Sequence, residues 1–534
     1  MPASASPTRA KASSCRRHRR PHVFQRLQIF LLLAVVRFQR QIRSTRRMHS
    51  FRKFTRSFDL RRFHGRAHAA TNTTEALRAS GATNQNGPRR DLLDVMMRRS
   101  NTSSLKTIFR FLQSHTPREH FDEVIYNHTM EYERCQRYGL AYTPQLLPGK
   151  GNPARRRRIF FGSLIADDSW HAIGAHAAEV YGLYHTAVFI ESNMTQTLTP
   201  RRMRFKAGSF NWEFLVSSGI FGSNTRVSMD YFDNRDRHLK ELIRENVQRG
   251  LILKTWKLNG MTSEDIGIVS DVDEVFSRDF LLAAMTCDVP EFRPGQNCHK
   301  PKIVASSLVL ESSPECIVDR RAWYHPDMAI GECIDTIGNA TDREPALREY
   351  ANKTLGRRTK GQFLKDWKDL PPRTRYPLWT PADFRCAEGG RQYPEKDPQS
   401  GQVLSHSGYN AFHMHNFFPD LTVLRNKYRT YGHPVWGADS KTLGQLHTDI
   451  KVAIMCAMNR TATKTERSLV RGGWAHLLSE GRRTPLLYAN EEYGRLHLNE
   501  LKDAIVVDES KHGETTFGPA VGSKRYRLPQ GTAK

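Results

Sequence analysis

Residues 158–192 decide the fold class and read RIFFGSLIADDSWHAIGAHAAEVYGLYHTAVFIES. The apolar run at 158–165 predicts a strand, and the run at 186–192 predicts a second strand that is buried on both faces. The segment 169–184 between them predicts a helix. A strand, a helix and a strand within about 35 residues form a βαβ unit, which implies a parallel sheet. We therefore expect an α/β fold.

The same alternation continues along the chain. Residues 236–256 predict a charged amphipathic helix, 265–269 predict another apolar strand, and 276–285 predict the helix that follows it. Two earlier helices are expected near 91–99 and 104–114, and no internal repeat is visible. The chain is therefore expected to build a mainly parallel central sheet.

Three carboxylates, those of Asp271, Asp273 and Glu274, follow the 265–269 strand in the stretch IGIVSDVDEVFSRDF. Ligands of open α/β sheets bind beyond the carboxyl ends of the strands. Like charges this close repel, and burying them is costly unless a positive group lies among them. A metal ion, a helix N-terminus or a solvated loop would each resolve this conflict.

Two interpretations of the acidic cluster stay open on the motif alone. Asp-x-Asp suits Mn²⁺ or Mg²⁺, with a nucleotide diphosphate supplying further oxygens, and the ion would neutralise the leaving diphosphate. Alternatively, the acids cap the following helix and complement its dipole. An EF-hand is excluded because its fifth position is Val275 here. The position after an apolar strand, downstream of a βαβ unit, favours the metal interpretation.

Three stretches resemble glycosyltransferase family 17, the β-1,4-N-acetylglucosaminyltransferases that add bisecting GlcNAc to the core mannose of N-glycans. They are FIESNMTQT at 189–197, QRGL at 248–251 and SDVDEVFSRD at 270–279. The resemblance is dense only in 185–280 and extends in outline over about 155–500. Looser matches are AFHMHNFF at 411–418, RGGWAH at 471–476 and PLLYAN at 485–490.

The chain departs from the family pattern at three places. Val275-Phe276 replaces Ile-Pro, Met414 replaces the Cys after the family's His, and ADDSWHAIGAHAAEV replaces a first helix that carries Glu and Arg. The chain therefore looks like a divergent member. The resemblance implies a GT-A-like fold and an inverting, Mn²⁺- or Mg²⁺-dependent transfer of GlcNAc from UDP-GlcNAc to a mannose of a glycoprotein N-glycan.

The resemblance also implies roles for the acidic cluster, with Asp271, Asp273 and Glu274 as the catalytic group. Asp273 is the first expected metal ligand. Asp271 shares the metal or contacts the ribose. Glu274 either orients these groups or caps the following helix. Inversion needs a general base near the acceptor hydroxyl, for which Asp279 and Glu332 are candidates.

Other expected contacts lie on two strands. Glu191 is expected at the uridine or ribose, with a strand-end salt bridge as the alternative, and Asn193 is a family match that is also a glycosylation sequon. His413 and His415 share a face of a strand. His413 is expected as the additional metal ligand that GT-A folds take from late in the chain. Trp474 is expected to stack on a sugar ring or to belong to the core.

The charge of the chain is unevenly placed. The 534 residues carry a formal net charge of +28, and 38% of them are hydrophobic, which is ample for a core. Residues 1–58 contain 15 Lys or Arg and no acid, so the remainder carries +13. A mildly basic body suits acidic or phosphorylated ligands or membrane surfaces. Since the tail dominates the charge, no nucleic-acid partner is expected.

The N-terminal tail holds one apolar run, IFLLLAVV at 29–36, with RRHRR at 16–20 before it. Eight residues are too few for a bilayer core, which needs about 20. The segment is consistent with a signal peptide or signal anchor, with a transit peptide, or with a basic nucleic-acid arm. We favour an anchor at 23–38 and hence a Golgi type II membrane protein with a lumenal catalytic domain.

Two further features bear on the compartment. Eight cysteines form no C-x-x-C pair and are consistent with scattered disulfides or buried thiols. One cysteine, Cys15, lies in the tail, which leaves an odd number in the body. Sequons for N-glycosylation fit a secretory route and occur at Asn72, Asn101, Asn127, Asn193, Asn339, Asn352 and Asn459.

The expected organisation has four parts, and two rival functions remain. A transferase using another UDP-sugar or acceptor is the nearer rival, and a non-catalytic polyanion-binding protein is the more distant one. The expected parts are a basic tail at 1–70, a stem or adaptor at 71–154, a catalytic domain at 155–510 with an irregular insertion at 355–406, and a disordered tail at 511–534.

Overall fold

The computed structural model describes thirteen stretches of the chain, all within a unit that spans Thr83–Lys534. The expectations for the 1–70 tail, the 23–38 anchor and Trp474 lie outside these residues. Among the described residues, none of the helices combines the length and apolar character needed to span a bilayer. The described stretches are 90–114, 128–142, 156–233, 241–293, 302–323, 325–335, 337, 381–385, 391–392, 409–417, 420–431, 434–458 and 491–512.

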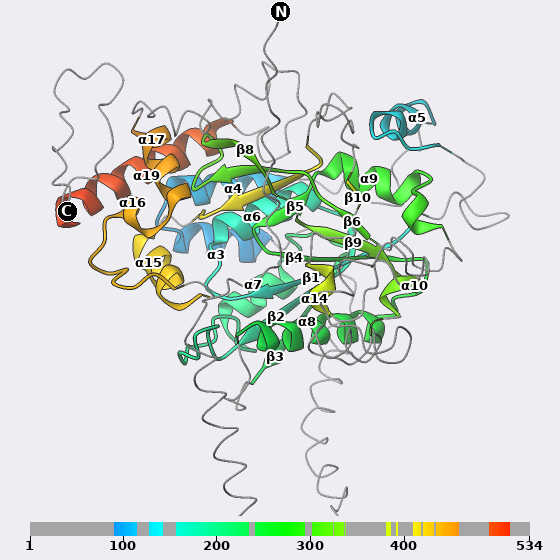
Figure 1. Cartoon of the computed structure of the whole chain (residues 1–534), viewed down its shortest axis with the longest axis horizontal. Coiled ribbons are helices and arrows are strands. Elements are labelled where there is room, and N and C mark those ends of the chain that lie inside the picture. Colours follow the sequence, from blue (N-terminus) through cyan, green and yellow to red (C-terminus); the bar gives the residue numbers. More distant parts are fainter. Residues whose placement is uncertain are drawn as a thin grey trace, which may run out of the picture. The chain divides into compact units, whose positions relative to one another are not determined.

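A seven-stranded sheet runs in the order β10-β6-β9-β4-β1-β2-β3 (Figure 1). Strands β4, β1, β2 and β3 are parallel to one another, and β10 is parallel to β6. Strand β9 runs antiparallel to both of its neighbours, β4 and β6. The expected α/β class with a mainly parallel sheet is therefore confirmed. The strands are β1 (Ile159–Ile165), β2 (Tyr184–Ser192), β3 (Arg226–Phe232), β4 (Ile266–Asp271), β6 (Lys302–Val304), β9 (Asp327–Ile330) and β10 (Arg391–Gln392).

The chain passes from strand β4 of the first sheet directly into a second, four-stranded sheet. Its order is β5-β11-β7-β8, with β5 at Glu274–Phe276, β7 at Ser307–Glu311, β8 at Ile317–Trp323 and β11 at Ala411–His415. Only Val272 and Asp273 separate β4 from β5. Asp273 therefore lies at the junction of the two sheets.

Helices cover the central sheet and extend beyond it. Figure 1 shows α6 and α8 on opposite sides of β1 and β2. The main helices are α3 (Arg90–Arg99), α4 (Ser103–Ser114), α5 (His128–Arg137), α6 (Trp170–Val180), α7 (Phe210–Ser217), α8 (Glu241–Leu258) and α9 (Arg278–Thr286). The later ones are α10 (Gly331–Ile334), α14 (Pro381–Phe384), α15 (Leu421–Thr430), α16 (Leu443–Leu446), α17 (Thr448–Ala457) and α19 (Glu491–His512).

The βαβ unit forms as expected, with shorter helical bounds. Every residue of α6 is buried, and the helix stops at Val180, four residues before the expected end. Gly182 then adopts φ +72°, a conformation that glycine tolerates best, and the chain turns into β2. Helix α8 packs close to β1 because Gly162 has no side chain: a Cβ there would lie 2.0 Å from Ile252.

Helices α3 and α4 come from the segment that was expected to be a stem, yet their apolar faces belong to the main core. Leu93 and Phe109 are fully buried, and the Phe109 ring packs edge-on against Trp170 and Phe214. The periodic apolar positions of these helices are buried because α6 and α19 lie against α4. The folded body therefore begins by residue 90.

Candidate functional site

The order of the central strands identifies the edge of the sheet where a ligand is expected. From β1 the sheet grows to β2 and β3 on one side, and then β4 lies on the other side of β1. Such a reversal is a topological switch point, and ligands of open α/β sheets bind there, beyond the carboxyl ends of the two strands. The residues after β1 include Asp168, and those at and after the end of β4 include Asp271 and Asp273. The acidic cluster therefore lies at the switch point.

Arginines supply the positive charge that the cluster requires. Asp271 is about half exposed, at 47%, and its Oδ2 lies 2.9 Å from Nη2 of Arg385. Its Oδ1 lies 3.4 Å from Nη2 of Arg249, a side chain that also pairs with Glu245. Arg385 belongs to the segment expected to be an irregular insertion, and no local pattern pointed to it. Both guanidinium groups also suit phosphate oxygens.

Glu274 is buried and holds the turn that carries the cluster. Its carboxylate accepts hydrogen bonds from the Asp271 backbone N–H at 3.1 Å, from Nε1 of Trp323 at 2.7 Å and from Nη2 of Arg385 at 3.0 Å. Burial alone would raise the pKa of Glu274, but the charge of Arg385 outweighs it and the pKa is lowered. Glu274 therefore stays ionised and orients its neighbours.

The helix-cap interpretation of the acidic cluster is wrong. Helix α9 is capped by Ser277, whose Oγ accepts a hydrogen bond from the Phe280 backbone N–H at 3.3 Å. The cause is that Glu274–Phe276 forms strand β5 in place of a helix entry. The cluster is thus separated from the helix by a strand.

Asp273 faces His413 across the junction of the two sheets. Oδ2 of Asp273 and Nε2 of His413 are 3.7 Å apart, and the two side chains are 17% and 7% exposed. Burial would raise the pKa of Asp273, but its interaction with His413 lowers it. Burial would likewise lower the pKa of His413, and Asp273 raises it. His413 also stacks on Trp323, with ring centroids 4.8 Å apart, so its ring is held in place.

Asp168 is a further carboxyl group at this edge of the sheet, and no sequence motif identified it. Its Oδ2 accepts a hydrogen bond from the Ala166 backbone N–H at 2.7 Å. Burial, followed by the negative charge of Asp273, raises the pKa of Asp168 to about 6. The available signal was the pair of acids directly after the first predicted strand, at the same edge of the sheet as the D-x-D motif.

Besides Asp271, Glu191 and Asn193 were expected at the nucleotide, and both make contacts within the protein. Glu191 is fully buried, and its oxygens accept hydrogen bonds from the backbone N–H groups of Arg204 at 2.7 Å and Phe205 at 2.9 Å. Arg201 adds an ion pair at 3.7 Å, so the alternative of a strand-end salt bridge describes these contacts. Asn193 donates to Oδ1 of Asp233 at 2.8 Å. Glu191 is separated from Asp271 by the width of β1, about 10 Å.

The two candidate general bases, Asp279 and Glu332, lie on helices α9 and α10. Asp279 binds Arg134 and Arg137 at 3.1 Å each and accepts a hydrogen bond from Tyr138, which links α9 to α5. Glu332 lies in the short helix α10. Asp279 is thus engaged as a structural link.

The residues around Asp273 have the donor chemistry of a divalent-cation site. Asp273 and His413 offer a carboxylate oxygen and an imidazole nitrogen that already face each other, and the charge of Asp273 acts on Asp168. Carboxylates suit Mn²⁺ and Mg²⁺, and imidazole is a common nitrogen ligand of divalent transition-metal ions. Of the expected ligands, Asp271 fits least well because its oxygens face Arg385 and Arg249.

No protein-family model matches this chain, and no curated protein matches it. Its function must therefore be inferred from the geometry and chemistry of this site.

Proposed function

We propose that this chain is a metal-dependent, inverting glycosyltransferase of GT-A-like fold. The observation that carries the proposal is the pairing of Asp273 with His413 at the switch point between β1 and β4, where an α/β sheet binds its ligand. The proposed donor, UDP-GlcNAc, and the proposed acceptor, a mannose of an N-glycan, rest on the resemblance of 185–280 to glycosyltransferase family 17.

Each part of the site has a task in this reaction. Asp273 and His413 would hold Mn²⁺ or Mg²⁺, which would supply Lewis-acid neutralisation of the departing diphosphate. Arg385 and Arg249 present guanidinium forks at the same edge and can contact phosphate oxygens. In the transfer, the acceptor hydroxyl attacks the anomeric carbon, the bond from that carbon to the diphosphate breaks, and the hydroxyl proton passes to a base.

The described cysteines favour a lumenal location in the secretory pathway. Cys135 is bonded to Cys287 and Cys316 to Cys456, and Cys333 is also disulfide-bonded. Stable disulfides are typical of oxidising compartments. Together with the sequons, of which Asn101 is exposed, they support our proposal of a Golgi enzyme that is anchored through 23–38.

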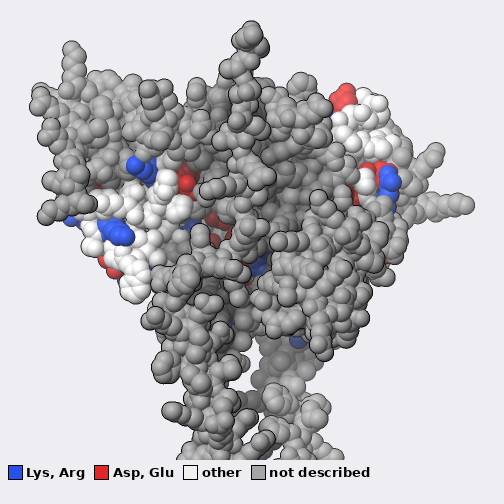
Figure 2. Space-filling view, in the orientation of Figure 1, with Lys and Arg blue, Asp and Glu red and all other residues white. Residues whose placement is uncertain are grey.

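The charges of the described surface residues in Figure 2 are of both signs, which supports an enzyme more than a polyanion-binding protein. On the face in Figure 2, the described Lys and Arg side chains lie beside Asp and Glu side chains. A polyanion-binding surface would present a basic stripe with interleaved aromatic residues. Arg385, a basic residue of the candidate site, is paired within the protein with Asp271 and Glu274.

UDP release by the full chain tests the proposal. Wild type, Asp273→Asn and the exposed control Asp439→Asn would be incubated with a panel of UDP-sugars, with and without Mn²⁺ and N-glycan acceptors. We expect Mn²⁺-dependent release from UDP-GlcNAc that is lost in Asp273→Asn and kept in the control. Release from another UDP-sugar would favour the nearer rival. Absence of release from every donor by folded protein, or full activity in Asp273→Asn, would contradict the proposal.

A further inference from the structure

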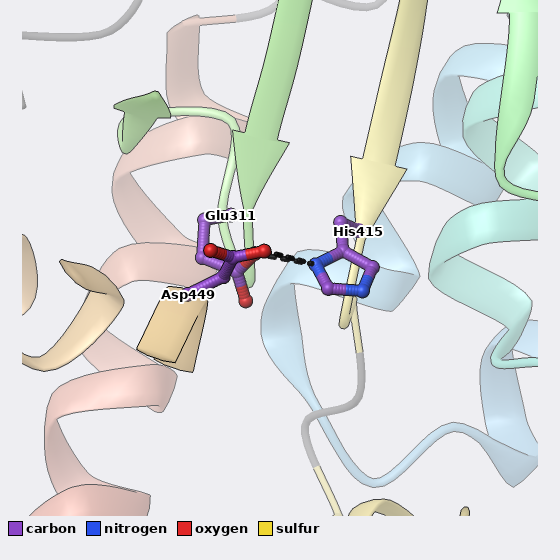
Figure 3. Close-up of side chains that lie close together, drawn as sticks. All are labelled: Glu311, His415 and Asp449. Carbon is purple, nitrogen blue, oxygen red and sulfur yellow. Dashed lines mark hydrogen bonds and ion pairs between the residues drawn. The ribbon is translucent and has the colours of Figure 1, made fainter. Parts of the chain in front are cut away.

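A second group of potential ligands lies on the four-stranded sheet. Glu311 ends β7, His415 ends the neighbouring strand β11, and Asp449 lies in the first turn of α17 (Figure 3). Nδ1 of His415 is 2.6 Å from Oε2 of Glu311 and 3.8 Å from Oδ2 of Asp449. One nitrogen and two carboxylate oxygens from three separate elements therefore point into one small space, within 4.8 Å of one another.

Hydrogen bonds from neighbouring side chains hold Glu311 in place. Glu311 is fully buried, and its Oε1 accepts hydrogen bonds from Nδ2 of Asn416 at 2.8 Å and from Oγ of Ser312 at 3.0 Å. These bonds leave Oε2 directed at His415. The same Asn416 amide is bound to the Tyr428 hydroxyl at 2.9 Å. Outer partners that orient a carboxylate in this way are characteristic of metal ligands.

A neighbouring side chain gives an independent indication. The ring of His413 lies 4.9 Å from that of His415, centroid to centroid, on the same face of β11. Its side chain is 7% exposed, and its Nδ1 has no hydrogen-bond partner among the described residues. A buried polar atom without a partner costs free energy. A hydrated ion next to this ring would provide the missing polar partner.

We propose that Glu311, His415 and Asp449 form a binding site for a divalent transition-metal ion, Zn²⁺, distinct from the site at Asp273. Imidazole nitrogen with carboxylate oxygens is a donor set that Zn²⁺ accepts. Two carboxylates balance the charge of the ion.

The observed distances need little adjustment. Ligand atoms about 2.1 Å from a tetrahedral ion lie about 3.4 Å apart. The 2.6 Å distance between His415 and Glu311 would lengthen, and the 3.8 Å distance between His415 and Asp449 would shorten, each by less than about 1 Å. The ion takes the place of the proton shared by His415 and Glu311, which is released to solvent.

Other charged and titratable groups face the site. Lys427 donates to Oδ1 of Asn416 at 3.2 Å, and its positive charge opposes cation binding. His447 lies beside Asp449, with its Nδ1 3.6 Å from Oδ2 of Asp449, but this nitrogen already accepts the backbone N–H of Asp449 at 3.1 Å and caps α17. The two carboxylates outnumber the single ammonium group, so the net charge still favours a cation.

The site would fasten α17 to the sheet and steady β11. The disulfide Cys316–Cys456 already links the start of β8 to the end of α17, and the ion would add a second link at the start of that helix. Because His413 lies two residues before His415, a fixed β11 also fixes the ring that faces Asp273. Zn²⁺ binding here does not depend on sugar transfer.

Zn²⁺ binding to the full chain tests the proposal. The purified protein would be dialysed against a chelator and titrated with Zn²⁺, without nucleotide, in competition with a chromophoric chelator. We expect a tight site in wild type that weakens more than about 100-fold in Glu311→Gln and in Asp449→Asn, since even outer-shell losses cost about 10–100-fold. Asp273→Asn and the exposed control Asp439→Asn should keep this site.

The variants also distinguish the two sites. Failure of wild type to bind Zn²⁺, unchanged binding by folded Asp449→Asn, or loss of the site in Asp273→Asn would each overturn the proposal. Circular dichroism establishes folding. If Glu311→Gln does not fold, Asp449→Asn decides the question. UDP release is a separate readout, so its failure would leave the Zn²⁺ result intact.

Discussion

Oδ2 of Asp273 lies 3.7 Å from Nε2 of His413, although the two residues are far apart in the sequence. The contact exists because β5 pairs with β11, which sets His413 opposite Glu274. The chain thus leaves the parallel sheet at Asp271 and enters the second sheet at Glu274, and Asp273 lies at the crossing. Asp273, just beyond the end of a strand of the seven-stranded sheet, therefore meets His413 of the four-stranded sheet at the switch point between β1 and β4.

Replacement of His413 tests whether this contact holds the cation. We expect His413→Asn to raise the Mn²⁺ concentration needed for half-maximal UDP release by more than about 10-fold, because a ligand is lost while the fold is kept. Turnover at saturating Mn²⁺ should fall less. The measurement is a Mn²⁺ activation curve for wild type and variant. An unchanged half-maximal concentration would remove His413 from the site.

Arg385 is expected to be important for stability. It is 12% exposed and is the main cation beside buried Glu274. Arg385→Met should lower the free energy of unfolding by about 3–5 kcal/mol, since it leaves a buried carboxylate unpaired. The matched control is Arg429→Met, which breaks an exposed pair with Asp439 and should cost about 0–1 kcal/mol. Urea denaturation of both variants gives the comparison, and equal losses would argue against this role.

Local pattern was sufficient to predict the strands that carry the candidate site. The apolar runs of β1, β2 and β4 predicted buried parallel strands, and Asp271 was expected where β4 ends. The antiparallel strand β9 was not predicted because its four residues, Asp327–Ile330, carry no periodicity that separates a strand from a loop. Periodicity reports how an element is buried and does not report which strand it pairs with.

The same limit applies to the site. The D-x-D motif was visible because its residues are adjacent, and the shared face of His413 and His415 followed from strand geometry. Arg385 and the Glu311–Asp449 approach depend on long-range packing and left no local signal. The alternative helix-cap interpretation failed for a related reason, since β5 forms by pairing with β11.

The disulfide between Cys316 and Cys456 should stabilise the second sheet and α17. Replacing both cysteines by serine is expected to lower the free energy of unfolding by about 2–5 kcal/mol, because the cross-link restricts the unfolded chain. Denaturation of the variant and of wild type measures the difference. Peptide mapping without reductant should recover the pair, and recovery of a different partner for Cys456 would contradict the structure.

His497 should make the protein sensitive to acid. It is 2% exposed, neither ring nitrogen has a hydrogen-bond partner among the described residues, and burial lowers its pKa to about 3. The folded state therefore favours the neutral ring. The stabilisation that comes from keeping the His497 ring neutral is complete above the unfolded pKa of about 6.5. It is lost as the pH falls from there toward 3.

His497→Phe removes the titrating group while keeping an aromatic ring beside Tyr493 and Phe417. We expect the variant to gain about 2 kcal/mol relative to wild type between pH 7.5 and pH 5, because wild type alone loses stability over that interval. Denaturation at the two pH values measures this difference. The control is Phe417→Leu, which changes the same packing without a titrating group and should shift stability equally at both. A pH-independent effect of His497→Phe would show that the ring acts only through packing.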